Sequence, residues 1–505
     1  MDRSLESLPF DTCADAALES ARAAGAEHAD VRHMSTRTGY LSVRDGALEG
    51  AADDESSGLS VRVLVDGCWG FASSDIVSTN EAARLARVAS TLAAMSRPLV
   101  TRRVTLAPEP VHVGSWTSAY EIDPFDVPEA ERIALLADRS RVLLSSAGVA
   151  HVDASLMQVR ESTAYADSAG TRTTQLRIRL QADWTATAID PTTGAFETMS
   201  TTAPPAGRGW EYLLGRGASV AGARPWDWDA ELAQLPELLA EKMRAPSVDP
   251  GRYTLVIDPT NLWLTIHESI GHATELDRAL GYEANYAGTS FATPDQLGTL
   301  RYGSPLMNVT GDRIAEHGLA TVGWDDEGVA GQRWDLIRDG VLVGYQLDRS
   351  MAAEFGYDRS NGCAYADSAA HVAIQRMPNV SLQPDPNGDD VAALIAGVED
   401  GLYIVGDKSW SIDMQRYNFQ FTGQRFMRIR SGRIEGQVKD VAYQSRTPDF
   451  WGSMVAVGSP DTYLLAGAFN CGKGQPGQVA PVSHGCPAAV FEGVNILNSV
   501  QEAGR

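Results

Sequence analysis

Asp-Gly dipeptides between alternating apolar residues recur along the chain, and they constrain its fold most strongly. Asp45-Gly46 and Asp66-Gly67 each separate two such runs, and Asp339-Gly340 repeats the arrangement in the second half of the chain. Asp-Gly favours the tight turn of a β-hairpin, because both residues tolerate the positive φ that this turn requires. Strands joined by short turns pair antiparallel, and helical patterns lie between them. The sequence therefore predicts an α+β fold.

Helical patterns flank the first hairpins. The alanine-rich run 11–23 is one, and Ser78 with Glu81 forms a capping box in front of a second. Pro128 occupies the first turn of a third helix, and residues 232–243 have the periodicity of a fourth. Helices mixed with hairpins predict a mixed α/β arrangement for the first half of the chain.

The length of the chain, 505 residues, exceeds what one hydrophobic core usually supports. We expect an N-terminal mixed α/β domain over residues 1–225, a helical linker region over 226–250 and a C-terminal domain over 251–505. Gly and Pro punctuate the last hundred residues, so the C-terminal domain is expected to be largely antiparallel β.

Charge and apolar runs exclude several classes of partner. The formal net charge is −23, which disfavours binding to nucleic-acid phosphates. No window reaches the roughly 18 apolar residues of a membrane span, and residues 1–10 lack the basic start and apolar core of a signal peptide. The five cysteines are unevenly spaced and do not suggest a disulfide framework. We expect a cytoplasmic protein that binds neither nucleic acid nor membrane.

The most informative motif is His267-Glu268-Ser-Ile-Gly271-His272, which follows a short strand and an Asp-Pro helix start. A His-Glu-x-x-His helix places two imidazoles on one face with a glutamate beside them as general base. One extra residue separates the histidines here, and at about 100° per residue a regular α-helix would aim them roughly 140° apart. A π-bulge would bring them back together, and Gly271 would ease it. A chance arrangement on a helix surface is the alternative.

Two histidines need at least one further protein ligand to hold a catalytic zinc ion. Glu275 and Asp277 could serve, or could orient the imidazoles, or could be ordinary surface acids. Cys471 lies in a Gly-rich turn, where the nearby Lys473 would favour its thiolate, although composition alone favours a buried, inert cysteine. Cys486, in Ser-His-Gly-Cys, is a weaker candidate. The residues alone leave these four possibilities open.

These motifs together resemble the TldD/PmbA metalloprotease family, also called modulators of DNA gyrase. The resemblance covers nearly the whole chain, from the N-terminal hairpins to the Gly-rich turn near the end. The stretches that carry it most clearly are Val61-Arg-Val-Leu-Val-Asp-Gly67, His267-Glu268-x-x-Gly271-His272-x-x-Glu275-x-Asp277, Asp325-Asp-Glu-Gly328, Arg376-Met-Pro-Asn379 and Cys471-Gly472-Lys473.

The resemblance implies a set of roles. His267, His272 and Cys471 would bind Zn²⁺, and Glu268 would act as the general base. The paralogous partner subunit of the family lacks this motif, so the chain looks like the TldD-type catalytic subunit. Such subunits assemble as homodimers or as heterodimers with a PmbA-type paralogue. They cut peptide bonds in unfolded or extended peptides, including precursors of peptide antibiotics.

Two departures from the family pattern concern the substrate. Leu276 stands where the family commonly has glycine, and residues 407–416 form a bulkier, more charged stretch than is usual. Two alternatives therefore stand beside a peptide-cleaving metalloprotease. One is a dedicated zinc amide hydrolase that acts on a small peptide-like metabolite, and the other is a peptide-binding subunit without catalytic activity.

Overall fold

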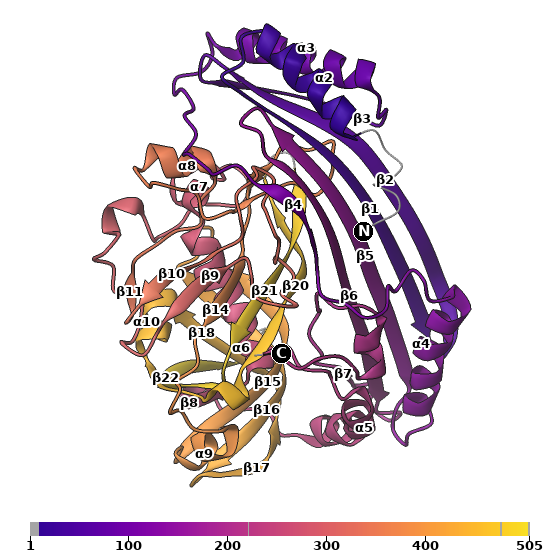
Figure 1. Cartoon of the computed structure of the whole chain (residues 1–505). Coiled ribbons are helices and arrows are strands. Elements are labelled where there is room, and N and C mark those ends of the chain that lie inside the picture. The colour runs from indigo at the N-terminus through magenta and orange to yellow at the C-terminus, as the bar shows by residue number, and fades with distance from the viewer. Residues whose placement is uncertain (1–9, 221, 475–476, 503–505) are drawn as a thin grey trace.

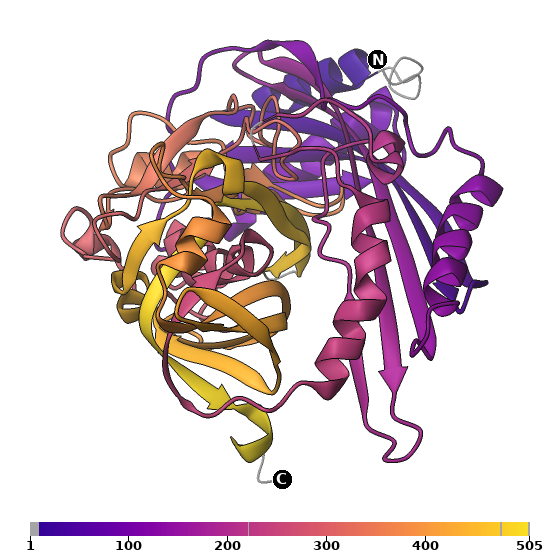
Figure 2. The same ribbon diagram turned by 90° about the horizontal axis from the view of Figure 1, so that it is seen from below.

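A computed structural model of the chain describes residues 10–220, 222–474 and 477–502 (Figure 1). The first nine residues, which hold most of the stretch judged unlike a signal peptide, lie outside the described residues. Within the described part no helix is long and apolar enough to cross a membrane. The long strands of an N-terminal sheet run along one side of the C-terminal half, and the view from below shows the two as neighbouring bodies (Figures 1 and 2).

Seven strands form the N-terminal sheet in the order β3-β2-β1-β5-β6-β4, with β7 also paired to β6. The first two Asp-Gly turns connect β1 to β2 and β2 to β3, which confirms the predicted hairpins. Asp45 and Asp66 both have a φ of 50°, as such turns require. The strands are β1 (His28–Arg44), β2 (Ala47–Val65), β3 (Cys68–Ser74), β4 (Val113–Thr117), β5 (His151–Asp167), β6 (Arg172–Ile189) and β7 (Phe196–Ser200).

Four helices pack on the apolar face of this sheet: α2 (Phe10–Ala23), α3 (Thr79–Ser96), α4 (Glu129–Leu144) and α5 (Trp228–Arg244). The first two share an alanine-rich core at one end, and the last two share a second core at the other. Ser78 caps α3 as predicted, since its side chain accepts a hydrogen bond from the backbone N–H of Glu81. In the second core the rings of Trp184 and Trp228 lie 5.2 Å apart.

The opposite face of the N-terminal sheet carries charges and contacts the C-terminal half. Arg62 pairs with Asp30 of the neighbouring strand at 2.8 Å and with Glu327 of the C-terminal half at 3.0 Å. Arg177, which strand alternation places opposite the apolar face, pairs with Glu161. All five side chains are buried. Because an unpaired buried charge is costly, the Arg62–Glu327 pair favours this arrangement of the two halves.

Strand pairing in the C-terminal half closes a ring: β15 pairs with β8, then β22, β18 and β16 follow, and β16 pairs back with β15. Only β8 and β15 are parallel within this ring, so the half is largely antiparallel, as predicted. A closed ring leaves no free strand edge between its members. The strands are β8 (Gly251–Ile257), β15 (Asp400–Ile412), β16 (Asn418–Arg430), β18 (Val441–Arg446) and β22 (Ala489–Asn498), extended by β17 (Arg433–Val438) and β19 (Met454–Val457).

Smaller elements surround the ring. One sheet has the order β11-β10-β9-β14, and two hairpin pairs, β12 with β13 and β20 with β21, complete the strands. Their bounds are β9 (Val309–Asp312), β10 (Arg333–Arg338), β11 (Val341–Leu342), β12 (Ala364–Tyr365), β13 (Ile374–Gln375), β14 (Asn379–Leu382), β20 (Leu464–Lys473) and β21 (Gln478–Cys486). The α-helices of this half are α6 (Pro259–Ile266), α7 (Leu276–Ala279), α8 (Arg349–Glu354), α9 (Val391–Ala396), α10 (Thr447–Gly452) and α11 (Ser499–Glu502). Short 3-10 turns cover Trp210–Leu214, Pro294–Gln296 and Pro460–Thr462.

Candidate metal centre

The candidate site begins where β8 ends and the short helix α6 starts. Asp258 caps this helix, because its side chain accepts hydrogen bonds from the backbone N–H of Thr260 and from the hydroxyl of Tyr403. Asn261, in the first turn, donates to backbone carbonyls of β15 and β16. These bonds attach α6 to the ring, so the residues that follow it have a fixed starting point.

The chain after α6 widens into one π-helical turn, His267–Gly271, and then tightens into the 3-10 turn His272–Thr274. The π-bulge that the spacing of the motif predicts is therefore present. The rings of His267 and His272 lie 4.7 Å apart as a result. Gly271 is needed because a Cβ at this position would lie 2.6 Å from Sδ of Met377.

Hydrogen bonds fix the tautomer of His267. Nδ1 of His484, on β21, lies 2.9 Å from the carbonyl oxygen of Val380 and donates to it, so Nε2 of His484 is an acceptor. Nδ1 of His267 lies 2.7 Å from that Nε2 and donates to it in turn. The lone pair of the neutral His267 ring is therefore on Nε2, where it is free to bind a metal ion.

Glu275 fixes the tautomer of His272 in the same way. Its Oε2 lies 2.9 Å from Nδ1 of His272 and accepts a hydrogen bond from the N–H there. The lone pair of His272 is therefore on Nε2, where it is free to bind a metal ion. Arg278 donates to the same carboxylate at 3.1 Å, and Lys473 binds its other oxygen at 3.0 Å. Lys473 also binds Asp277 at 2.8 Å. Glu275 thus orients an imidazole, whereas Asp277 holds the lysine that supports Glu275.

Cys471, on β20, brings the third donor. Its Sγ lies 3.6 Å from Nε2 of His272. Burial raises the pKa of the Cys471 thiol to about 11, and the neighbouring Arg376 guanidinium opposes that rise. Arg376 donates to the Cys471 carbonyl through Nη2, while its buried Nε and Nη1 have no hydrogen-bond partner within the described part of the chain. Arg376, rather than Lys473, is therefore the cation that favours the thiolate.

The three side chains fit a bound metal ion. Their donor atoms all lie within 4.8 Å of one another, and all three residues are buried. A tetrahedral zinc ion at about 2.1 Å from nitrogen and 2.3 Å from sulfur would hold those two atoms about 3.6 Å apart. Burial lowers the pKa of His272 to about 3 and that of His267 well below its usual range, so both rings are neutral and have a lone pair to donate.

Glu268 lies in the π-turn between the two histidines. Its carboxylate is buried and forms an ion pair with Arg416, with 2.5 Å between Oε2 and Nη1. Burial raises the pKa of Glu268, and the Arg416 guanidinium limits that rise. A carboxylate with a raised pKa, held next to a candidate metal site, has the properties of a general base.

A cleft of about 440 Å³ between the two halves adjoins this site. Its walls are β6 and residues 200–205 on one side and parts of β15 and β20 on the other. Trp263 and Trp410 line it, and both lie close to site residues: the Trp263 ring stacks on His484 at 6.2 Å, and Trp410 lowers the pKa of Glu268. The two tryptophans thus connect the cleft to the site, although His267, Glu268, His272 and Cys471 do not themselves line it.

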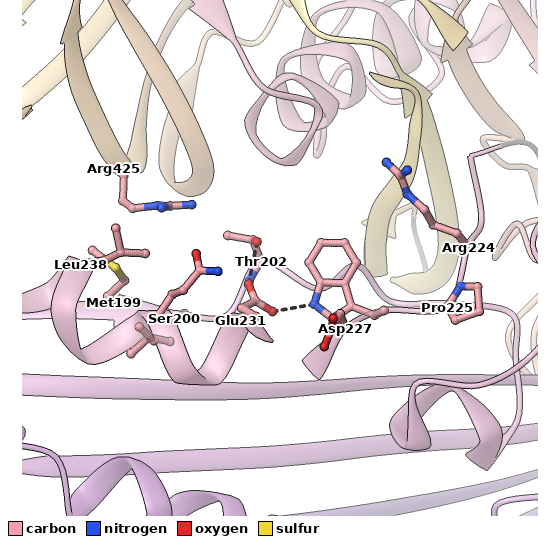
Figure 3. Close-up of a pocket in the computed structure, with 12 residues that line it drawn as sticks. Met199, Ser200, Thr202, Arg224, Pro225, Asp227, Glu231, Leu238 and Arg425 are labelled. Atoms are coloured by element: carbon pink, nitrogen blue, oxygen red, sulfur yellow. Dashed lines mark hydrogen bonds between the residues drawn. The ribbon is translucent and has the colours of Figure 1, made fainter. Parts of the chain in front are cut away.

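A second cavity of about 390 Å³ lies next to the first (Figure 3). Ser200 and Thr202 line both cavities. In the second cavity Arg425 and Arg224 approach from the C-terminal half and from the segment before α5 (Figure 3). Its lining includes none of the predicted site residues, and none of the tryptophans that lie close to the site.

The structure separates the four residues that competed for the third ligand position. Cys471 joins the histidines, and Glu275 and Asp277 lie behind them. Cys486 does not join the cluster: its Sγ donates to the carbonyl of Pro259 at 3.6 Å. The Ser-His-Gly-Cys segment nonetheless contributes to the site through its histidine.

Sequence reasoning missed three residues of the site: His484, Arg376 and Arg416. In the sequence, His484 stands out only as the histidine of the Ser-His-Gly-Cys segment, two positions before Cys486, which is itself a weak ligand candidate. Arg376 belongs to one of the stretches that carry the family resemblance, and Arg416 ends the atypical stretch 407–416. Position in a motif was thus a signal for each, but it did not reveal a role.

Comparison with known proteins gives a consistent result. Residues 250–498 match the model of a PmbA/TldA metallopeptidase C-terminal domain, and residues 29–96 match that of PmbA/TldA metallopeptidase domain 1. A protein of Methanothermobacter thermautotrophicus named as a metalloprotease is 28% identical over 468 residues, which cover 91% of this chain and 93% of that relative. A zinc metalloprotease TldD homolog of Saccharolobus solfataricus is 26% identical over 264 residues, 52% of this chain and 55% of the relative.

Solved structures share the fold over almost the whole chain. TldE from Thermococcus kodakarensis superposes with a TM-score of 0.70 at 14% identity and covers 96% of this chain and 99% of its own. A Thermotoga maritima protein named as a candidate modulator of a DNA gyrase gives a TM-score of 0.74 at 15% identity, with 97% and 100% covered. At these identities the likeness concerns the fold alone.

Proposed function

The chain belongs to the PmbA/TldD metallopeptidase family, and from this premise we propose that it is a zinc-dependent metalloprotease that cuts unfolded or extended peptides. His267, His272 and Cys471 would hold the zinc ion, and Glu268 would be the general base. In this proposal the chain is the TldD-type catalytic subunit of a dimer, formed with a second copy or with a PmbA-type paralogue.

The proposal rests mainly on one observation. Hydrogen bonds donated to His484 and Glu275 by the Nδ1 atoms of the motif histidines leave both Nε2 atoms free to bind a metal ion, and the donor atoms of the two histidines and Cys471 lie within 4.8 Å of one another. Such support of histidine ligands by a second layer of hydrogen-bonding residues is typical of metal sites in proteins. In a histidine pair with a purely structural role, we would expect both ring nitrogens to be hydrogen-bonded within the core. Two unpaired nitrogen lone pairs close to one thiol are instead typical of a metal site.

A bound zinc ion polarises a carbonyl oxygen and makes water more acidic, which is the chemistry that amide hydrolysis requires. The chain's own residues complete the reaction. Glu268 accepts a proton from the attacking water and passes it to the leaving amine, which its raised pKa favours. Trp263 and Trp410 wall the approach to the site and limit the access of bulk water.

The shape of the cleft supports an extended substrate. It lies between two halves of the molecule and shares Ser200 and Thr202 with the second cavity, and an extended strand is the substrate shape that such neighbouring cavities would suit. Main-chain hydrogen bonds along such a cleft would bind a peptide with little side-chain selectivity.

The proposed function is tested by measuring metal content and cleavage of disordered β-casein together. Wild type is expected to carry about one zinc ion per chain and to cut β-casein. Glu268→Gln should keep the zinc and lose cleavage. Cys471→Ala should lose both, whereas Cys486→Ala, which alters a buried cysteine outside the cluster, should keep both.

Each result has a definite meaning. A Glu268→Gln protein that still cuts β-casein at the wild-type rate would contradict the role of the base. Zinc retained in Cys471→Ala would move the third ligand to another residue. A folded wild type that binds no zinc would contradict the zinc site. A wild type that binds zinc but leaves β-casein intact would contradict the substrate class.

A further inference from the structure

We propose that Arg416 is a catalytic residue, which binds the carbonyl oxygen of the scissile bond as negative charge develops on it. This inference rests on the proposed function and assigns a role that the zinc-binding motif does not contain. Its basis is the placement of one guanidinium beside the general base, on a loop whose backbone is held from several directions.

The guanidinium of Arg416 has spare hydrogen-bonding capacity at the site. Nη1 pairs with Oε2 of Glu268 at 2.5 Å, and Nη2 donates weakly to the carbonyl of Ala287 at 3.3 Å. Its buried Nε has no hydrogen-bond partner among the described residues. Arg278 offers a contrast, since it is fully buried and donates to Glu275 and to the same carbonyl of Ala287. The hydrogen bonds of Arg278 thus go to other parts of the protein, while the guanidinium of Arg416 has N–H groups that no residue of the described chain uses.

The loop that carries Arg416 is built to hold it in place. The carboxylate of Asp413 accepts hydrogen bonds from the backbone N–H groups of Gln415, Tyr417 and Asn418. Arg416 itself has a φ of 62°, a left-handed conformation that costs energy in a residue with a side chain. A strained residue that is held this firmly indicates that the position of its side chain matters.

Further contacts join the loop to the segment that follows the site. The backbone N–H groups of Thr289 and Phe291 donate to the carbonyls of Met414 and Gln415 at 2.8 and 3.0 Å. The hydroxyl of Thr447 donates to the carbonyl of Arg416 at 2.7 Å. The guanidinium is therefore fixed before substrate arrives, which is the condition under which a charged group stabilises a transition state most effectively.

The movement of charge during hydrolysis explains why a cation is placed here. In the resting protein Arg416 is balanced by the ionised Glu268. When water attacks, its oxygen bonds to the carbonyl carbon, the C=O π electrons move to the carbonyl oxygen, and the proton goes to Glu268. Glu268 becomes neutral while a new anion forms on the substrate. Arg416 loses one partner and gains another, so its interaction is strongest in the transition state.

Three variants test the role: Arg416→Ala, Arg416→Lys and, as a surface control, Arg430→Ala. Arg430 is an exposed arginine at the end of β16, and its side chain is 57% accessible. With β-casein as substrate, Arg416→Ala should reduce kcat by about 100-fold or more, as the loss of one oxyanion donor does elsewhere. KM and zinc content should stay close to wild type. The kcat of Arg416→Lys should lie between those of wild type and Arg416→Ala, because an ammonium group keeps the charge but lacks the forked pair of donors of a guanidinium.

Two readouts separate this role from a structural one. Added methylguanidinium should restore part of the activity of Arg416→Ala and leave Arg430→Ala unchanged. A phosphinic tetrapeptide of alanine and phenylalanine, which presents a tetrahedral anion, should bind Arg416→Ala about 100-fold more weakly in calorimetry. The parent tetrapeptide, measured in a Glu268→Gln background, should bind nearly equally with and without Arg416.

The proposal would be overturned by kcat within about threefold of wild type in Arg416→Ala, or by a raised KM at unchanged kcat, which indicates ground-state binding. Equal losses of affinity for the phosphinic and parent peptides would also overturn it. If Arg416→Ala does not fold, Arg416→Lys decides on the same criteria, because it keeps the buried charge paired. An inactive wild type would instead contradict the proposed function, so the two failures are distinguishable.

Discussion

His484 accepts a hydrogen bond from His267, with 2.7 Å between Nε2 and Nδ1, and through this bond a residue on β21 decides which atom of His267 faces Cys471. The carbonyl of Val380 determines the tautomer of His484 in turn, at 2.9 Å from Nδ1. The orientation of one candidate ligand therefore depends on a backbone carbonyl of β14, which shares no sequence motif with it.

This dependence predicts that His484→Ala lowers zinc affinity by about 10- to 100-fold without removing a ligand, because His267 loses the partner that fixes its proton. Competition with a chromogenic chelator measures the change. His151→Ala, a half-exposed histidine paired with Asp45, is the matched control and should bind zinc like wild type. Unchanged affinity in His484→Ala would show that the hydrogen bond does not tune the site.

The π-turn predicts a steric conflict in Gly271→Ala. The added Cβ would lie 2.6 Å from Sδ of Met377 and 3.5 Å from Cε1 of His484. We expect a loss of about 1–3 kcal/mol in the free energy of unfolding, as overpacked cores show, together with weaker zinc binding. Because the clash is with the end of a flexible side chain, Met377→Ala in the same protein should relieve it.

Urea denaturation of the two single variants and the double variant measures this coupling. The double variant should be more stable than the sum of the single effects predicts. Additive effects would mean that Met377 is not the obstacle, and that the π-turn itself resists a side chain at this position.

Asp183, on β6 at the wall of the cleft, predicts a pH dependence of stability. Burial raises the pKa of Asp183 to about 6, and the nearby Glu231 and Asp407 add to the effect. In the unfolded chain an aspartate titrates near about 3.9, so the folded protein binds more protons between the two values. Its contribution is therefore fully present below about pH 4 and is lost as the pH rises through about 6.

Asp183→Asn removes this titration and keeps one of the two acceptor oxygens that Thr185 and Thr201 use. The difference in free energy of unfolding, wild type minus Asp183→Asn, should fall by on the order of 2 kcal/mol from pH 4 to pH 7. Chemical denaturation across this range measures it. Parallel stability curves for the two proteins would mean that Asp183 titrates normally in the folded state.

Local patterns predicted much of the fold, because turns and caps depend on neighbouring residues. Asp45-Gly46 forms its hairpin, Ser78 caps its helix, and the spacing of His267 and His272 produces the π-turn. The lengths of the strands could not be predicted in the same way, because the ends of a strand such as β5 are set by its pairing to β1 and β6.

The site was predicted as far as sequence proximity or family resemblance reached. His484 lies 217 positions from its partner His267, and only the packing of β21 against α6 brings them together. Arg376 and Arg416 are likewise joined to their partners by tertiary contacts. A hydrogen bond across such separations leaves no periodic trace in the chain, so reasoning from spacing could not find it.

The buried charges at the boundary between the two halves have a consequence for how substitutions there combine. Arg62 binds Asp30 of its own sheet and Glu327 of the C-terminal half, and all three are buried. Replacing Glu327 by a neutral residue leaves Arg62 with one carboxylate partner instead of two. Replacing Arg62 leaves both Asp30 and Glu327 without the cation that they share. Substitutions at the three positions are therefore expected to be energetically coupled, so that the stability of each half depends on a charge that the other half supplies.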